Sequence, residues 1–163
     1  MYMKKRLLSA ALSLFLLTGL SRVSAQSYSS GTDYKNALGM GVDFGHGATL
    51  FGVSGKHFFW PNHVGQGEIL FGNREIFISL FYQFHRELEN APGLRWFLGG
   101  GGTLDVHSKF SDFSLRPMAG LDYKINNIPL NLSIDWRPGF QLTHNSDVEA
   151  GRFGFGFRYT FTQ

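Results

Sequence analysis

The chain has 163 residues, a net charge of +3 and no cysteine. After removal of the export signal described below, the remainder has the size of one domain, which excludes a multidomain enzyme. The excess positive charge belongs to Lys4, Lys5, Arg6 and Arg22 in that leader, so basicity gives no reason to expect a nucleic-acid partner. The absence of cysteine excludes a disulfide scaffold, a thiolate metal site and a cysteine nucleophile.

The beginning of the chain has the features of a signal peptide. A positive stretch at residues 4–6 precedes an apolar run at 7–20, and small or modest side chains at 23–25 suit a cleavage site before Gln26. The apolar run of 14 residues is shorter than the ~20 that a transmembrane helix needs. We therefore expect a signal peptide over residues 1–25, a flexible polar tail over 26–36 and the folded domain over 37–163.

The clearest structural pattern lies at the end of the chain. Aromatic side chains occupy every odd position from 153 to 161, and small or polar residues occupy the even ones. Side chains of a β-strand alternate between its two faces, so this pattern predicts a strand with one continuous aromatic face. Such a face needs a large apolar surface opposite it, which the hydrocarbon of a membrane supplies. The aromatic residues are Phe153, Phe155, Phe157, Tyr159 and Phe161.

Similar alternation recurs upstream and predicts eight strands in all. The pattern is clear in residues 76–85, 95–107, 113–125 and 130–137, and weaker in 38–44, 51–59 and 69–71. Clusters of Gly, Pro, Asn and Asp between these segments supply turns. Strands that are apolar on one face can cross a bilayer only when every backbone group is paired, which requires closure of the sheet. The sequence predicts an all-β fold, an eight-stranded antiparallel up-and-down transmembrane β-barrel.

The opposite face of the predicted strands carries nearly all their charges. An eight-stranded barrel is only wide enough for side chains to fill, so acids and bases of similar number should form an ion-pair network in the interior. This predicts a filled barrel and no open pore. The predicted interior set is Asp43, Lys56, Glu68, Arg95, Asp105, Arg116, Asp122, Lys124, Asp135, Arg137 and Arg158.

Aromatic residues near strand ends predict a girdle at one membrane interface. We expect Trp60, Trp96, Trp136, Tyr82, Tyr123 and Tyr159 to flank the turns on the side of the chain termini.

The chain resembles the small outer-membrane β-barrel proteins of Gram-negative bacteria, and residues 90–161 are similar to a Bacteroidetes-type family of them. The resemblance is carried by residues 92–96 with the glycine run that follows, and by 120–124, 127–138 and 158–161. It implies the barrel fold and an outer-membrane location, and it implies no particular activity. Residues 157–161 also resemble the C-terminal signal that the barrel-assembly machinery recognises, although Thr162 and Gln163 follow the last Phe. The assembly signal would comprise the five aromatic residues of the last strand.

Two alternatives stay open. His144, Ser146 and Glu149 resemble the His and Ser of lipid A deacylases with a carboxylate nearby, on a connection expected to be extracellular. Their composition is also that of an ordinary polar loop, which we favour. The second alternative is a secreted or periplasmic ligand-binding barrel, but its charged face would point outward, the reverse of the arrangement predicted here.

The six histidines lie on separate segments without helical pairing, so no metal site and no cofactor are expected. The sequence thus predicts a non-catalytic integral protein of the cell outer membrane with a structural or surface-interaction role. Its expected partners are lipopolysaccharide and phospholipid, and the assembly machinery during biogenesis.

Overall fold

The computed structural model describes residues 34–161, except 46, 74, 108–110 and 144–146. The predicted signal peptide and most of the predicted tail lie outside this part of the chain.

Strands make up the ordered secondary structure. They are β1 (Asn36–Gly45), β2 (Leu50–Trp60), β3 (His63–Phe71), β4 (Ile76–Glu87), β5 (Leu94–Val106), β6 (Ser111–Lys124), β7 (Leu130–Trp136), β8 (Gly139–Gln141), β9 (Val148–Glu149) and β10 (Arg152–Phe161). The described residues contain no helix that could cross a membrane.

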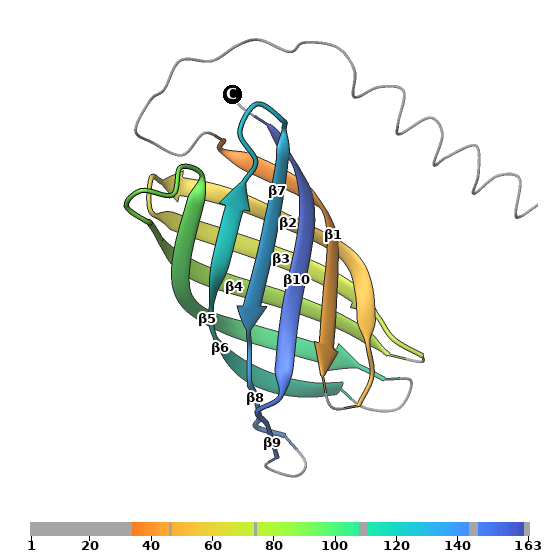
Figure 1. The fold of residues 1–163 in the computed structure, drawn as a ribbon. Helices are drawn as coiled ribbons and strands as arrows, with labels where there is room; N and C mark the ends of the chain where they lie inside the picture. The colour runs from red at the N-terminus through yellow and green to blue at the C-terminus, as the bar shows by residue number, and fades with distance from the viewer. Residues whose placement is uncertain (1–33, 46, 74, 108–110, 144–146, 162–163) are drawn as a thin grey trace, which may run out of the picture.

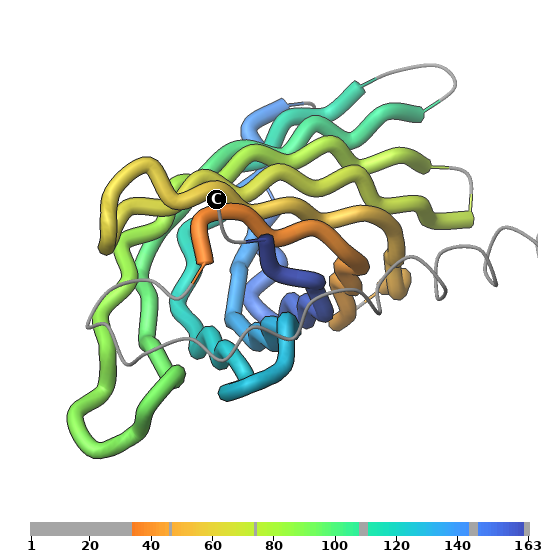
Figure 2. Tube along the Cα trace, turned by 90° about the horizontal axis from the view of Figure 1, so that it is seen from above, coloured from red at the N-terminus to blue at the C-terminus, as the bar shows by residue number. Residues whose placement is uncertain are grey.

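The sheet closes into an antiparallel eight-stranded barrel (Figures 1 and 2). Strands β1 to β7 follow one another around the wall, β10 pairs with both β7 and β1, and β5 pairs with β6 to complete the ring. The short strands β8 and β9 prolong the connection from β7 to β10. Closure gives each long strand two neighbours, so the barrel wall has no free edge.

The barrel has two distinct ends. Asn36 of β1 pairs with Phe161 of β10 at one end, which we call the terminal end. The turns β2–β3, β4–β5 and β6–β7 lie at this end, because the strands alternate in direction. The far end holds the connections β1–β2, β3–β4 and β5–β6, and the β8–β9 hairpin projects from it (Figure 1).

Side chains alternate between the lumen and the outer wall as the period-two pattern predicts. In β10, Arg152, Arg158 and Thr160 are buried inside, whereas Phe153 and Phe155 are each 40% exposed outside. The same alternation holds around the ring, so apolar side chains cover the outside and most charged ones fill the inside.

The lumen also holds apolar groups that the sequence pattern does not predict. Tyr34, Ala37, Phe58 and Val64 form a cluster at the terminal end. Phe81, Phe97 and Met118 form a second cluster deeper in the barrel. The chain enters the lumen before the predicted start of the domain at residue 37, since Tyr34 is buried.

The weak alternation in β2 and β3 now has a physical explanation. Leu50, Phe58, Val64 and Leu70 point inward in these strands. Glycines occupy several outward positions of the same strands, so apolar residues do not mark the outer face there as they do in β10.

The glycine run of β5 allows β4 and β5 to approach closely. A Cβ at Gly101 would overlap the carbonyl oxygen of Leu80 and lie 2.7 Å from the Cα of Phe81. The neighbouring Gly100 faces the other way, and a Cβ there would come no nearer than 3.4 Å to Arg116 or Pro117. Only glycine fits at position 101 without a shift of the backbone.

We expect Gly101→Ala to lower the free energy of unfolding by ~1–3 kcal/mol, the usual cost of overpacking. Gly100→Ala is the matched control and should leave it nearly unchanged. Urea titration of the refolded protein, followed by tryptophan fluorescence, measures both. Equal stability of the two variants would contradict the close approach of β4 and β5.

Candidate functional site: a charged lumen inside an apolar outer wall

Near the terminal end, a buried carboxylate organises the first polar group of the lumen. Asp122 forms an ion pair with Lys56 through Oδ2. Its Oδ1 accepts hydrogen bonds from the hydroxyl of Tyr34 at 3.1 Å and from the amide of Asn131 at 2.7 Å. These partners come from β2, β7 and the segment before β1, so Asp122 of β6 connects distant parts of the wall.

Arg158 occupies the middle of the lumen. Its guanidinium donates to Ser54 Oγ at 2.7 and 3.0 Å and to Ser133 Oγ at 2.8 Å. Its Nη2 also lies 3.6 Å from an oxygen of Glu68. Arg158 is completely buried, and these partners offset part of the large cost of removing its charge from water.

Towards the far end, Arg137 bridges two carboxylates. It donates to Glu68 Oε2 at 2.6 Å and to both oxygens of Asp135, at 2.5 and 2.8 Å. A Cβ on Gly154 would overlap its guanidinium, so the absence of a side chain there gives Arg137 its space. Arg137 therefore connects β7 to β3 across the lumen.

A third carboxylate in this region is held by two arginines. Asp43 accepts hydrogen bonds from Arg116 at 2.6 Å and from Arg152 at 2.9 Å. All three side chains are buried, and they join β1, β6 and β10.

The structure buries the predicted interior residues with two exceptions. Asp105 and Lys124 are partly exposed at opposite ends of the barrel. Lys124 Nζ donates to the carbonyl oxygens of Ile125 and Ile128 in the β6–β7 turn. Arg95 pairs with Glu87 near the terminal end. The remaining predicted residues are Asp43, Lys56, Glu68, Arg116, Asp122, Asp135, Arg137 and Arg158, all buried.

Sequence reasoning placed Gln83 and His85 on the polar face of their strand, but it missed Gln66. Gln83 donates to Gln66 at 2.9 Å, and His85 lies 2.8 Å from Gln83, so a chain of neutral polar groups runs beside the ionic ones. Arg152 was missed as well, although it shares its parity with Arg158 in the same strand. Extending the alternation one position before Phe153 would have found it.

The outer wall is apolar over most of its surface. Among its exposed side chains are Met40, Phe51, Val53, Ile69, Leu80, Leu98, Leu115, Leu121, Ile134, Phe155, Phe157 and Phe161. The five predicted assembly-signal aromatics all lie on the outer side of β10, with Tyr159 the least exposed of them. One predicted girdle residue departs from expectation, because Trp136 pairs with Phe153 at the far end.

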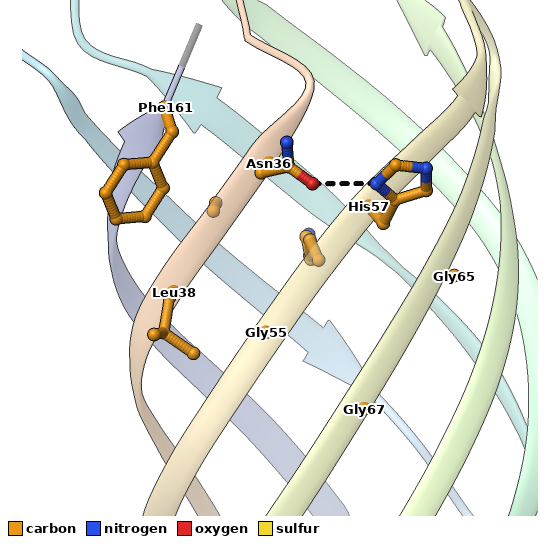
Figure 3. Close-up of a pocket in the computed structure, with 9 residues that line it drawn as sticks. Asn36, Leu38, Gly55, His57, Gly65, Gly67 and Phe161 are labelled. Carbon is orange, nitrogen blue, oxygen red and sulfur yellow. Dashed lines mark hydrogen bonds between the residues drawn. The ribbon is translucent and has the colours of Figure 1, made fainter. Parts of the chain in front are cut away.

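A shallow groove interrupts the outer wall near the terminal end (Figure 3). Gly55, Gly65 and Gly67 form its floor, and Leu38 and Phe161 lie on one side. His57 Nδ1 lies 2.7 Å from Asn36 Oδ1 at its upper end. The groove follows from the absence of side chains at these glycines of β2 and β3.

Of the three residues considered for lipid A deacylation, the structure describes only Glu149. His144 and Ser146 lie outside the described residues. Glu149 is exposed in β9, with one carboxylate oxygen 3.5 Å from Arg152. The structure therefore brings no described histidine or serine to this carboxylate.

Comparisons with known proteins add no family. No protein-family model matches the chain, and a search of curated proteins finds no match either.

Arg137→Leu should lower the free energy of unfolding by ~3–5 kcal/mol, because Glu68 and Asp135 would keep buried charges without their shared partner. Asp135→Leu should have an effect in the same range. Glu87→Gln is the control at an exposed ion pair and should cost ~1 kcal/mol or less. Urea midpoints and the heat-modifiable gel shift measure the difference. If Arg137→Leu were as stable as the wild type, the ionic network of the lumen would not be needed for the stability of the barrel.

Proposed function

We propose that the chain is an integral outer-membrane β-barrel protein of a Gram-negative bacterium. In this proposal its role is structural or one of surface interaction, it is not an enzyme, and it does not form an open pore. Its partners are lipopolysaccharide and phospholipid around the wall, and the barrel-assembly machinery during insertion. The signal peptide and the Bacteroidetes-type resemblance read from the sequence belong to the same proposal.

The observation that carries the proposal is the inversion of the barrel. Leu80 is 72% exposed at the middle of β4, and Met40 and Phe51 are 58% and 61% exposed on neighbouring parts of the wall. Contiguous apolar surface of this extent is rare on soluble monomers. A soluble ligand-binding barrel would bury such groups inside and expose its charges. Hydrocarbon chains are the surroundings that suit the wall described here.

Strand lengths support the same interpretation. The strands β1, β2 and β10 have 10, 11 and 10 residues. A transmembrane β-strand needs ~9–11 residues when tilted. Closure of the sheet supplies the backbone hydrogen bonds that lipid cannot provide.

The packing of the lumen favours a barrel with a filled interior and does not favour an open channel. Arg137, which follows β7, reaches Glu68 of β3 on the opposite side of the ring, and Arg158 of β10 reaches Ser54 of β2 on the inner side of β1. An eight-stranded barrel has room for side chains and little else. The links across the lumen occupy the path that ions would take.

The outward stripe of β10 supports recognition by the assembly machinery. Phe157 and Phe161 are 44% and 43% exposed, so a partner that pairs with the last strand during folding could contact them. Thr162 and Gln163 lie outside the described residues.

A charge in the middle of the outer wall tests the proposal directly. Leu80→Arg should lower the free energy of unfolding in phospholipid vesicles by ~2–4 kcal/mol, the cost of arginine at the bilayer midplane. Ile128→Arg introduces the same charge at an exposed apolar residue of the β6–β7 turn, and should cost ~0–1 kcal/mol. Equal, small effects of the two substitutions would support the soluble barrel instead.

Conductance measurements test the filled lumen. Purified protein inserted into planar bilayers should give no steady ion current, because the ionic network closes the passage. Steady, ion-selective conductance that scales with the number of inserted molecules would overturn this part of the proposal and leave the membrane location intact.

A further inference from the structure

Three potential metal ligands meet at the far end of the barrel. Asp105 is the next-to-last residue of β5, and His107 follows the strand, so the two share the inward-facing side. Glu75 precedes β4. Because Phe77 pairs with Asp105, continuing this register by two residues places Glu75 opposite His107. The fold therefore gathers three side chains that are far apart in sequence.

The distances bring these groups within reach of one ion. His107 Nε2 lies 2.9 Å from Glu75 Oε1, and His107 Nδ1 lies 3.4 Å from Asp105 Oδ1. Each residue offers one ligand atom, and these atoms all lie within 4.8 Å of one another. Zinc holds nitrogen and oxygen ligands at ~2.0–2.2 Å. Binding of one ion requires the two carboxylates to approach the same nitrogen of His107.

A second observation is that one oxygen of Asp105, Oδ1, is buried and accepts no hydrogen bond from any residue in the described part of the chain, although His107 Nδ1 lies 3.4 Å from it. Asp112 lies directly opposite Asp105 in the register of β5 and β6. Like charges directly opposite one another across a sheet are destabilising. A cation bound by Asp105 would satisfy this oxygen and lower the repulsion.

The position also allows an ion to enter. The side chains of Asp105, His107 and Glu75 are 18%, 22% and 34% exposed. They therefore lie at the mouth of the barrel, where water reaches them, unlike the sealed ion pairs of the lumen.

We propose that Glu75, Asp105 and His107 bind a divalent cation of the zinc class. One imidazole nitrogen and two carboxylate oxygens form a ligand set that suits a borderline metal, with water in the remaining position. The imidazole binds in its neutral form, and the two carboxylates balance the charge of the ion. This proposal departs from the expectation from the sequence that the histidines bind no metal. It does not depend on the membrane location, because it needs only the barrel.

Isothermal titration with zinc chloride tests the site. The probe is full-length protein without a polyhistidine tag, refolded in detergent and first freed of metal with a chelator. We expect one zinc ion per barrel. Glu75→Gln, Asp105→Asn and His107→Gln should each weaken binding by ~10-fold or more, since even residues that only support a ligand have effects of this size. His57→Gln removes a histidine at the terminal end and should bind zinc as the wild type does.

A stability measurement separates metal binding from simple removal of an ion pair. Zinc should raise the thermal midpoint of the wild type and of His57→Gln, because a ligand that binds only the folded state stabilises it. It should raise the midpoint of Glu75→Gln and Asp105→Asn much less. Glu75 is the most exposed of the three ligands, so Glu75→Gln remains informative if Asp105→Asn folds poorly; the heat-modifiable gel shift shows which variants are folded.

The proposal fails if the folded wild type shows no stoichiometric zinc binding. It also fails if Glu75→Gln binds zinc as tightly as the wild type, or if His57→Gln abolishes binding. In the first case the three side chains form an ion-paired cluster and nothing more.

Discussion

Charges enclosed in a narrow barrel must find partners inside it, and the other features of this structure depend on that constraint. Arg137 and Arg158 are almost completely buried, and the cost of removing such ions from water is several kcal/mol each before pairing. Some of their partners come from the other side of the ring, as Glu68 does for Arg137. The ionic network therefore stabilises one arrangement of the strands and fills the interior at the same time.

The same constraint determines the outer surface. Because side chains alternate along a strand, each inward charge in β10 leaves an aromatic neighbour pointing outward, as Arg158 does with Phe157. A soluble barrel would reverse this order. The polar lumen and the apolar wall are thus one feature of the sequence seen from its two sides, and the proposed lipid environment would suit both as well as backbone closure.

Much of the fold could be predicted because period-two alternation is local. It was strongest in β10, and it placed Arg158 and Asp135 inside correctly by parity alone. It failed where apolar residues point inward, as Phe58 does, and where the partner lies in a segment without alternation, as Tyr34 does before β1. The cluster of Glu75 with His107 was not predictable, because it depends on the register between β4 and β5. Only the Asp-x-His spacing of residues 105 and 107 was visible in the sequence, and one pair of ligands does not indicate a site.

The central claim is that the apolar outer wall faces lipid, and the accessibility of a spin label to collision partners tests it most directly. The chain has no cysteine, so one introduced cysteine places the label at one chosen position. Ile134→Cys places it in the middle of β7, on the outer wall, and Ile128→Cys places it in the β6–β7 turn. In phospholipid vesicles, the label at 134 should collide often with oxygen and rarely with a water-soluble nickel complex, whereas the label at 128 should meet the nickel complex freely. Equal access of the nickel complex to both positions would show that the apolar wall faces water and would contradict the account.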